Sequence, residues 1–130
     1  MEPVFPQVLP FSDVALLCLR LIVAAVFFTS GFRHLKDPVG RGASVGLSPG
    51  LSLLLGWVEM AAAAGVALGV LTQVAALGLM VVMLGAIQKK VFVWHTGFWG
   101  EQTYGWHYDL TFLIANLVIL TTGGGDLVLL

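Results

Sequence analysis

Residues 42–88 form the longest stretch of the chain that is almost free of charge, with Glu59 as its single charged side chain. At ~1.5 Å per residue this stretch would be about 70 Å long as a helix, roughly twice the thickness of a bilayer core. It must therefore cross a membrane twice. The composition agrees, because 58% hydrophobic residues, 10% charged residues and a mean hydropathy of +0.97 leave too little polar surface for a soluble domain. We expect an all-α integral membrane protein.

Four apolar segments are expected to form one four-transmembrane-helix bundle, a single membrane domain over residues 1–130. The spans are residues 14–32, 50–71, 74–93 and 106–122. Ser48 and Pro49 are a typical N-cap and first-turn pair for the second span. We expect a glycine-rich loop between the first two spans. Residues 1–12 carry no Lys or Arg, so the first span is expected to be a retained helix rather than a secretory signal.

Basic residues are confined to the loops after the first and third spans. They are Arg33, Lys36, Arg41, Lys89 and Lys90, and the loops on the other side have none. By the positive-inside rule, these two loops face the cytoplasm and both termini face outside. The expected location is the cytoplasmic (inner) membrane of a bacterium or archaeon, as a multi-pass protein in contact with the lipid bilayer. The net charge of -1 predicts no nucleic-acid partner.

A stripe of small residues recurs every four positions in the second span. It consists of Ala61, Gly65 and Gly69. Such a stripe allows another helix to approach closely, either within this bundle or from another subunit. Glu59 points the other way and shares a face with Ala63 and Val66, so the second span is expected to have two interfaces.

Three charged residues lie inside the expected spans: Arg20, Glu59 and Asp109. A charge at the bilayer centre costs ~2.5 to 3.5 kcal/mol on insertion scales, so it persists where it is paired or functional. Helical rise places Arg20 and Glu59 at depths that their side chains can bridge, with Asn116 near Arg20. The three charged residues are candidate catalytic residues of a quinone or proton-handling site. The alternative is a buried ion pair between Arg20 and Glu59 that fixes the helix register.

A second group of polar and aromatic side chains is expected at the cytoplasmic edge, together with Glu101. The candidate cofactor-binding residues in it are His34, His95, Trp106 and His107. Aromatic walls with histidine donors suit a quinone, whose carbonyls need hydrogen bonds and whose ring needs apolar contact. The alternative is an interfacial aromatic belt. The separation of His95 and His107 matches no standard metal or haem spacing, so no metal is expected.

Several short motifs follow one another in a characteristic order. They are residues 31–35 (GFRHL), residues 56–59 (GWVE), His95 with Gly97 and Phe98, and residues 105–109 (GWHYD). In order and spacing they resemble the DoxX family of small four-helix bacterial and archaeal membrane proteins, over nearly the whole chain. The chain departs from the family pattern in three places: His34 stands where Lys is usual, Asp109 stands where Glu is usual, and the usual Ser-Leu-Asp close is missing after residues 123–126.

The resemblance implies a function because members of this family include subunits of thiosulfate:quinone oxidoreductase and of membrane oxidoreductase complexes in oxidative-stress defence. It implies a membrane subunit of a quinone-linked oxidoreductase, with quinone as a possible cofactor and with partner subunits that carry the electron donor. The alternative is a non-catalytic accessory subunit of a larger respiratory or photosynthetic complex. A transporter or channel is disfavoured, because four short helices leave little room for alternating access.

Overall fold

The computed structural model describes residues 2–100 and 104–129, and all regular structure within them is helical. In chain order the elements are η1 (Pro6–Phe11, a 3₁₀-helix), α1 (Ser12–Lys36), α2 (Pro38–Ser44), α3 (Pro49–Leu68), α4 (Thr72–Gln88), η2 (Lys89–Val93, a π-helical turn) and α5 (Trp106–Thr122). The expected all-α class is confirmed for these residues.

Three helical segments of the described chain are long and apolar enough to cross a membrane. They are Pro6–Lys36, Pro49–Leu68 and Thr72–Val93. The fourth expected span is a helix with the expected bounds, α5, but its 17 residues fall short of the ~20 that usually cross a bilayer. The membrane class is therefore supported, and the number of four crossings is not confirmed.

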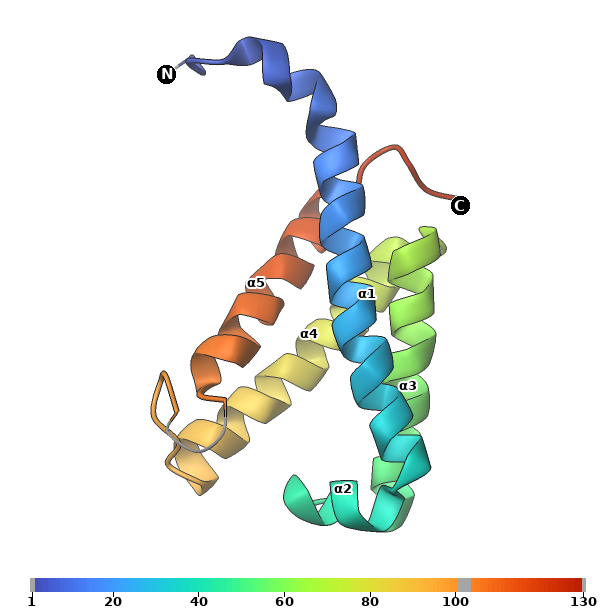
Figure 1. Cartoon of the computed structure of the whole chain (residues 1–130), viewed down its shortest axis with the longest axis vertical. Helices are drawn as coiled ribbons and strands as arrows, with labels where there is room; N and C mark the ends of the chain where they lie inside the picture. The colour runs from blue at the N-terminus through green and yellow to red at the C-terminus, as the bar shows by residue number, and fades with distance from the viewer. Residues whose placement is uncertain (1, 101–103, 130) are drawn as a thin grey trace.

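The helices form two pairs, in which α1 packs along α3 and α4 packs along α5 (Figure 1). A tight turn over residues 69–71 joins α3 to α4. Both termini lie at one end of the molecule, and α2 and η2 lie at the other end (Figure 1). This second end carries the basic loop residues, and we call it the basic end.

The helix ends follow local sequence signals. Ser48 is the predicted N-cap of α3, and its Oγ accepts a hydrogen bond from the Leu51 N–H (3.3 Å). Gly69 ends α3 in the left-handed region (φ 75°), a conformation that glycine adopts without steric cost. The helix therefore stops at Leu68, three residues before the expected bound.

The expected loop between the first two spans contains a helix, so that expectation is wrong. The α1 helix continues to Lys36, so its polar last turn is helical beyond the end of the apolar run. Asp37 then caps the short helix α2, with its Oδ1 accepting the Gly40 N–H at 3.0 Å and Pro38 in the first turn. This helix places Arg41 beside the end of α1.

The closest approach of α1 and α3 is at two glycines that face one another. A Cβ added to Gly31 would lie 2.6 Å from the Gly56 carbonyl oxygen, and one added to Gly56 would lie 2.8 Å from the Gly31 carbonyl oxygen. Of the predicted stripe, Ala61 is exposed, whereas Gly65 faces the turn into α4. A Cβ added to Gly69 would lie 2.6 Å from the Val128 Cα, so Gly65 and Gly69 both approach backbone within this chain, while α1 meets α3 at Gly31 and Gly56 instead.

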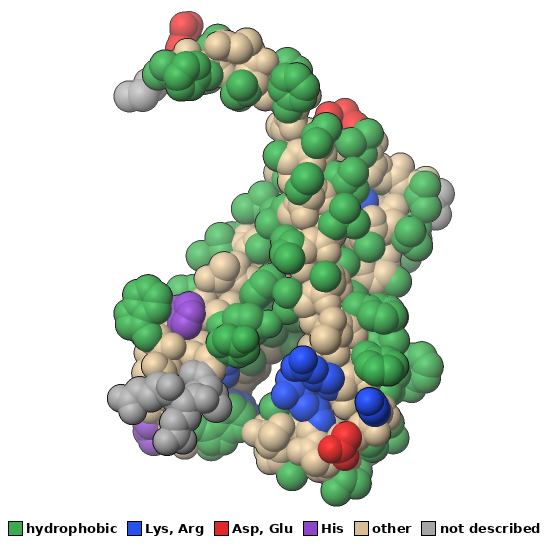
Figure 2. Space-filling view, in the orientation of Figure 1, with side chains coloured by type: hydrophobic (Ala, Val, Ile, Leu, Met, Phe, Trp, Pro, Cys, Tyr) green, Lys and Arg blue, Asp and Glu red, His purple; other side chains and the backbone are tan. Residues whose placement is uncertain are grey.

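The core lies where the two pairs meet, and it includes the face of α3 predicted to hold Glu59, Ala63 and Val66. The rings of Phe27 from α1 and Phe112 from α5 meet edge to face, with centroids 5.8 Å apart. Many large hydrophobic side chains remain exposed on the outer helix faces (Figure 2). Such a surface is suited to lipid contact.

Candidate functional site

The structure separates the candidate residues into two groups and two isolated residues. His34 lies with Glu59, and Trp106, His107 and Asp109 lie together in the first turn of α5. Arg20 lies apart from both groups, and His95 lies in an exposed loop.

Arg20 is buried (1% exposed), and its guanidinium donates four hydrogen bonds to backbone carbonyls. Nε donates to the Val66 oxygen (2.8 Å) and Nη2 to the Ala67 oxygen (3.0 Å), both in the last turn of α3. Nη1 donates to the oxygens of Gly124 (3.3 Å) and Leu127 (2.7 Å), in the tail after α5. The last carbonyls of a helix have no partner inside the helix, so Arg20 satisfies them and ties three segments together.

The expected ion pair between Arg20 and Glu59 is wrong. Glu59 lies seven residues before Val66 on α3, or about 10 Å along the helix axis, and its carboxylate bonds to other groups. The expected contact of Asn116 with this pair is also wrong, because its Nδ2 donates to the Phe112 oxygen of the same helix (2.8 Å). Arg20 instead donates to backbone carbonyls that lie at its own position along the bundle axis.

His34 and Glu59 are held together between α1 and α3. The Glu59 Oε2 accepts a hydrogen bond from the Ser30 Oγ (3.0 Å) and lies 3.9 Å from the His34 Nε2. On the other side of the ring, the His34 Nδ1 lies 2.7 Å from the Ser52 Oγ. His34 is 2% exposed and Glu59 3% exposed. These four residues form a buried polar chain, which we call the His34–Glu59 cluster.

The two serines of this cluster were not singled out by the sequence reasoning. Ser30 precedes His34 by four residues and Ser52 precedes Glu59 by seven. Residues four or seven positions apart lie on the same face of a helix, so the helical period was the signal in the sequence that could have identified the two serines.

Asp109 forms an ion pair with Lys90, whose Nζ lies 2.7 Å from the Asp109 Oδ2. The pair connects η2 to the first turn of α5, where the helix dipole favours a negative charge. Tyr108 lies beside this pair, with its ring centroid 5.7 Å from the Lys90 Nζ.

The aromatic segment before α5 forms a compact cluster. The Trp106 and Phe98 rings meet edge to face (4.6 Å between centroids), and the His107 Nδ1 lies 2.6 Å from the Phe98 carbonyl oxygen. His95 is exposed with a backbone φ of 51°. Glu101, expected in the same group, lies outside the described residues.

Titratable and aromatic side chains thus lie near one another toward the basic end. The imidazole of His34 and the carboxylate of Glu59 can each hold or release a proton, and hydroxyl groups orient both. Within residues 2–100 and 104–129, no three His, Cys, Asp or Glu side chains are grouped so that they could hold a metal ion.

Comparisons with known proteins give two matches. A family model described as DoxX matches residues 15–96, which include all but the first three residues of α1, the whole of α2 to α4, the His34–Glu59 cluster and Lys90, but not α5. An uncharacterized membrane protein of Mycobacterium tuberculosis is 32% identical over 125 residues, an alignment that covers 85% of this chain and 76% of the relative. No solved structure matches the chain.

Proposed function

This chain belongs to the DoxX family of membrane proteins, and on that basis we propose that it is the membrane subunit of a quinone-linked oxidoreductase. A partner protein carries the electron donor in this proposal, and the His34–Glu59 cluster exchanges protons with the quinone.

The observation that carries the proposal is the buried His34–Glu59 cluster. Ionisable side chains inside membrane segments are expensive, and they mark proton relays or ligand sites more often than ordinary packing. Quinone reduction takes up two protons with two electrons, so a quinone site needs a source of protons near the ring. A histidine and a carboxylate that are shielded from water and bonded to two serines fit this requirement.

The donor chemistry near the basic end also fits a quinone. An imidazole N–H or a hydroxyl donates to a quinone carbonyl, and aromatic side chains contact the ring. Tyr108 offers both, because its hydroxyl can donate or accept a hydrogen bond and its ring stacks on that of Tyr104 (4.7 Å between centroids). The proposed ring position is therefore beside Tyr108, next to the Lys90–Asp109 ion pair.

Arg20 takes a structural role in this proposal. All four of its hydrogen bonds go to backbone carbonyls, at the end of the bundle that holds the termini. Asp109 is retained as a candidate for proton exchange, and its carboxylate is paired with the Lys90 ammonium.

The test combines bound-quinone analysis with two matched substitutions in one turn of α1. The protein is purified in mild detergent, its quinones are identified by mass spectrometry, and quinone reduction is measured in the intact assembly. Ser30→Ala removes the hydrogen bond to Glu59, whereas Thr29→Val removes a hydroxyl that donates only to the Ala25 carbonyl. We expect Glu59→Gln and Ser30→Ala to lower quinone reduction at normal subunit content and Thr29→Val to leave it unchanged.

A different outcome would favour an accessory subunit without catalysis. An apolar groove of about 490 Å³ runs between α1 and α3 on the lipid-facing side, with Ala25, Ala64 and Ala67 among its lining residues. Small residues of this kind admit a helix of a partner subunit. If Glu59→Gln assembles normally, no quinone is bound and electron transfer is unchanged, the oxidoreductase proposal fails and the accessory role replaces it.

The proposal includes a topology of four crossings, with α5 as the last and both termini outside the cytoplasmic membrane of a bacterium. The positive-inside rule supports this orientation, since the basic end is opposite both termini (Figure 1). The test is labelling of Ser12→Cys and Ser44→Cys by an impermeant maleimide in intact cells. The background carries Cys18→Ser, because Cys18 is exposed. We expect only position 12 to react, and reaction at position 44 would reverse the orientation.

A further inference from the structure

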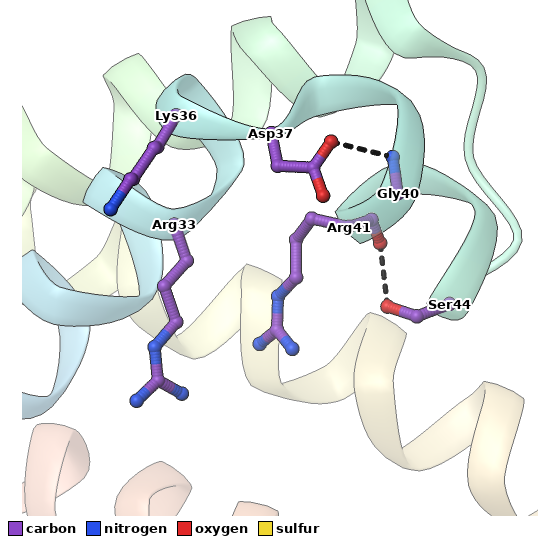
Figure 3. A pocket seen from close by; sticks show the side chains of 6 residues that line it. All are labelled: Arg33, Lys36, Asp37, Gly40, Arg41 and Ser44. Carbon is purple, nitrogen blue, oxygen red and sulfur yellow. Dashed lines mark hydrogen bonds between the residues drawn. The ribbon is translucent and has the colours of Figure 1, made fainter.

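Three cationic side chains line one cleft at the basic end, where α1 passes into α2 (Figure 3). The cleft has a volume of about 450 Å³, and its lining residues are Arg33, Lys36, Asp37, Gly40, Arg41 and Ser44. The space-filling view shows the blue side chains gathered beside a hollow in the surface (Figure 2). We call this site the basic cleft.

The charges of the basic cleft are not balanced by the described residues. Asp37 is the single carboxylate in the lining, and its Oδ1 already accepts the Gly40 N–H as the cap of α2. The ion pairs found within residues 2–100 and 104–129 involve none of the three cations. The Arg41 Nε is shielded from solvent and has no hydrogen-bond partner there. The cleft therefore carries excess positive charge and an unused buried donor.

The backbone around Arg41 is held by its own hydrogen bonds. The Arg41 N–H donates to the Asp37 carbonyl oxygen (2.9 Å), and the Ser44 Oγ donates to the Arg41 carbonyl oxygen (2.7 Å). The guanidinium groups of Arg33 and Arg41 point in the same direction (Figure 3). Two forks aimed in one direction suit the oxygens of a single tetrahedral anion.

We propose that the basic cleft binds the phosphate of an anionic phospholipid headgroup. The cleft begins in the last turn of α1, directly after the apolar run, which is the depth of lipid headgroups. Basic pockets beside transmembrane helices commonly hold anionic lipids. Two large apolar side chains next to the lining residues, Phe32 (52% exposed) and Val39 (65% exposed), offer contact to the lipid tails. A free phosphate ion would gain nothing from these two side chains, so the lipid is the favoured source of the phosphate.

The test measures lipid retention by native mass spectrometry. The full chain is reconstituted in vesicles of equal parts phosphatidylglycerol and phosphatidylcholine, extracted in mild detergent and analysed for bound lipid. We expect one phosphatidylglycerol to be retained in preference to phosphatidylcholine. Arg41→Gln removes the guanidinium whose Nε has no partner among the described residues and is expected to lower this retention about tenfold, the effect of one charge-assisted contact.

Lys89→Gln is the matched control. It removes one positive charge from the same end of the bundle, but Lys89 does not line the basic cleft. Its retention should stay within about twofold of the parent chain. Arg33→Gln is a second variant in case Arg41→Gln unfolds, which gel filtration and thermal melting would reveal. Equal losses for Arg41→Gln and Lys89→Gln would overturn the proposal in favour of diffuse attraction. Saturation of the cleft by inorganic phosphate, with no preference for phosphatidylglycerol, would overturn the lipid as its ligand.

Discussion

Replacing Arg20 by methionine is expected to be the most destabilising single change in the bundle. Methionine keeps the length and apolar stem of the side chain and removes every donor. The carbonyls of Val66 and Leu127, which accept the two shortest bonds (2.8 and 2.7 Å), then lose a charged partner. Hydrogen bonds to charged groups contribute ~1.5 to 3 kcal/mol each, so these two alone amount to about 3 to 6 kcal/mol. Relief from burying the cation offsets part of this, and we expect a net loss of about 3 kcal/mol.

The assay is unfolding by titration of SDS into mild-detergent micelles, followed by tryptophan fluorescence, with limited carboxypeptidase digestion of the tail. The tail should be digested faster in Arg20→Met, because it loses both bonds from Arg20 to its carbonyls. The hydrogen bond from the Leu129 N–H to the Leu68 carbonyl oxygen (3.1 Å) then remains as its backbone bond to α3. Arg20→Lys should be intermediate, since one ammonium cannot reach all four carbonyls. Arg33→Met is the control, because Arg33 is an exposed arginine of the same helix. If Arg20→Met is as stable as Arg33→Met and its tail is equally protected, the proposed role of Arg20 is refuted.

Two further predictions concern contacts between helices and use the same SDS titration. Gly31→Ala places a Cβ 2.6 Å from the Gly56 carbonyl oxygen and should lower the free energy of unfolding by about 1 to 3 kcal/mol. Gly78→Ala is the control, because its Cβ meets nothing within 4 Å and should cause no loss of stability. Equal stability of the two variants would contradict the close approach. Asp109→Asn should destabilise more than the double variant with Lys90→Gln, because it leaves the Lys90 ammonium, 15% exposed, without its carboxylate; a coupling below about 0.5 kcal/mol in the double-mutant cycle would argue against a stabilising ion pair.

The sequence by itself determined the membrane class, the helix positions, the buried face of α3 and the family. These properties depend on local features, namely apolar length, helical period, caps and the order of short motifs. Trp106–Thr122 was predicted with its observed bounds, because a glycine precedes it and three follow it. The short helix α2 was missed. Its Asp37 and Pro38 are a start signal, but two glycines among its seven residues lower its helix propensity, and packing against α1 and α3 supports it.

Only the tertiary structure decided the partners of the charged residues. Arg20 binds the carbonyls of Val66, Ala67, Gly124 and Leu127, and every residue offers the same carbonyl, so no side-chain pattern indicates these partners. The prediction from the sequence considered only side chains as partners of Arg20, and it chose Glu59 because that carboxylate lies at a membrane depth that Arg20 could reach. The basic cleft was also decided by the tertiary structure. The positive-inside rule places its cations on one side of a membrane, but they come together only because α2 folds back beside the end of α1.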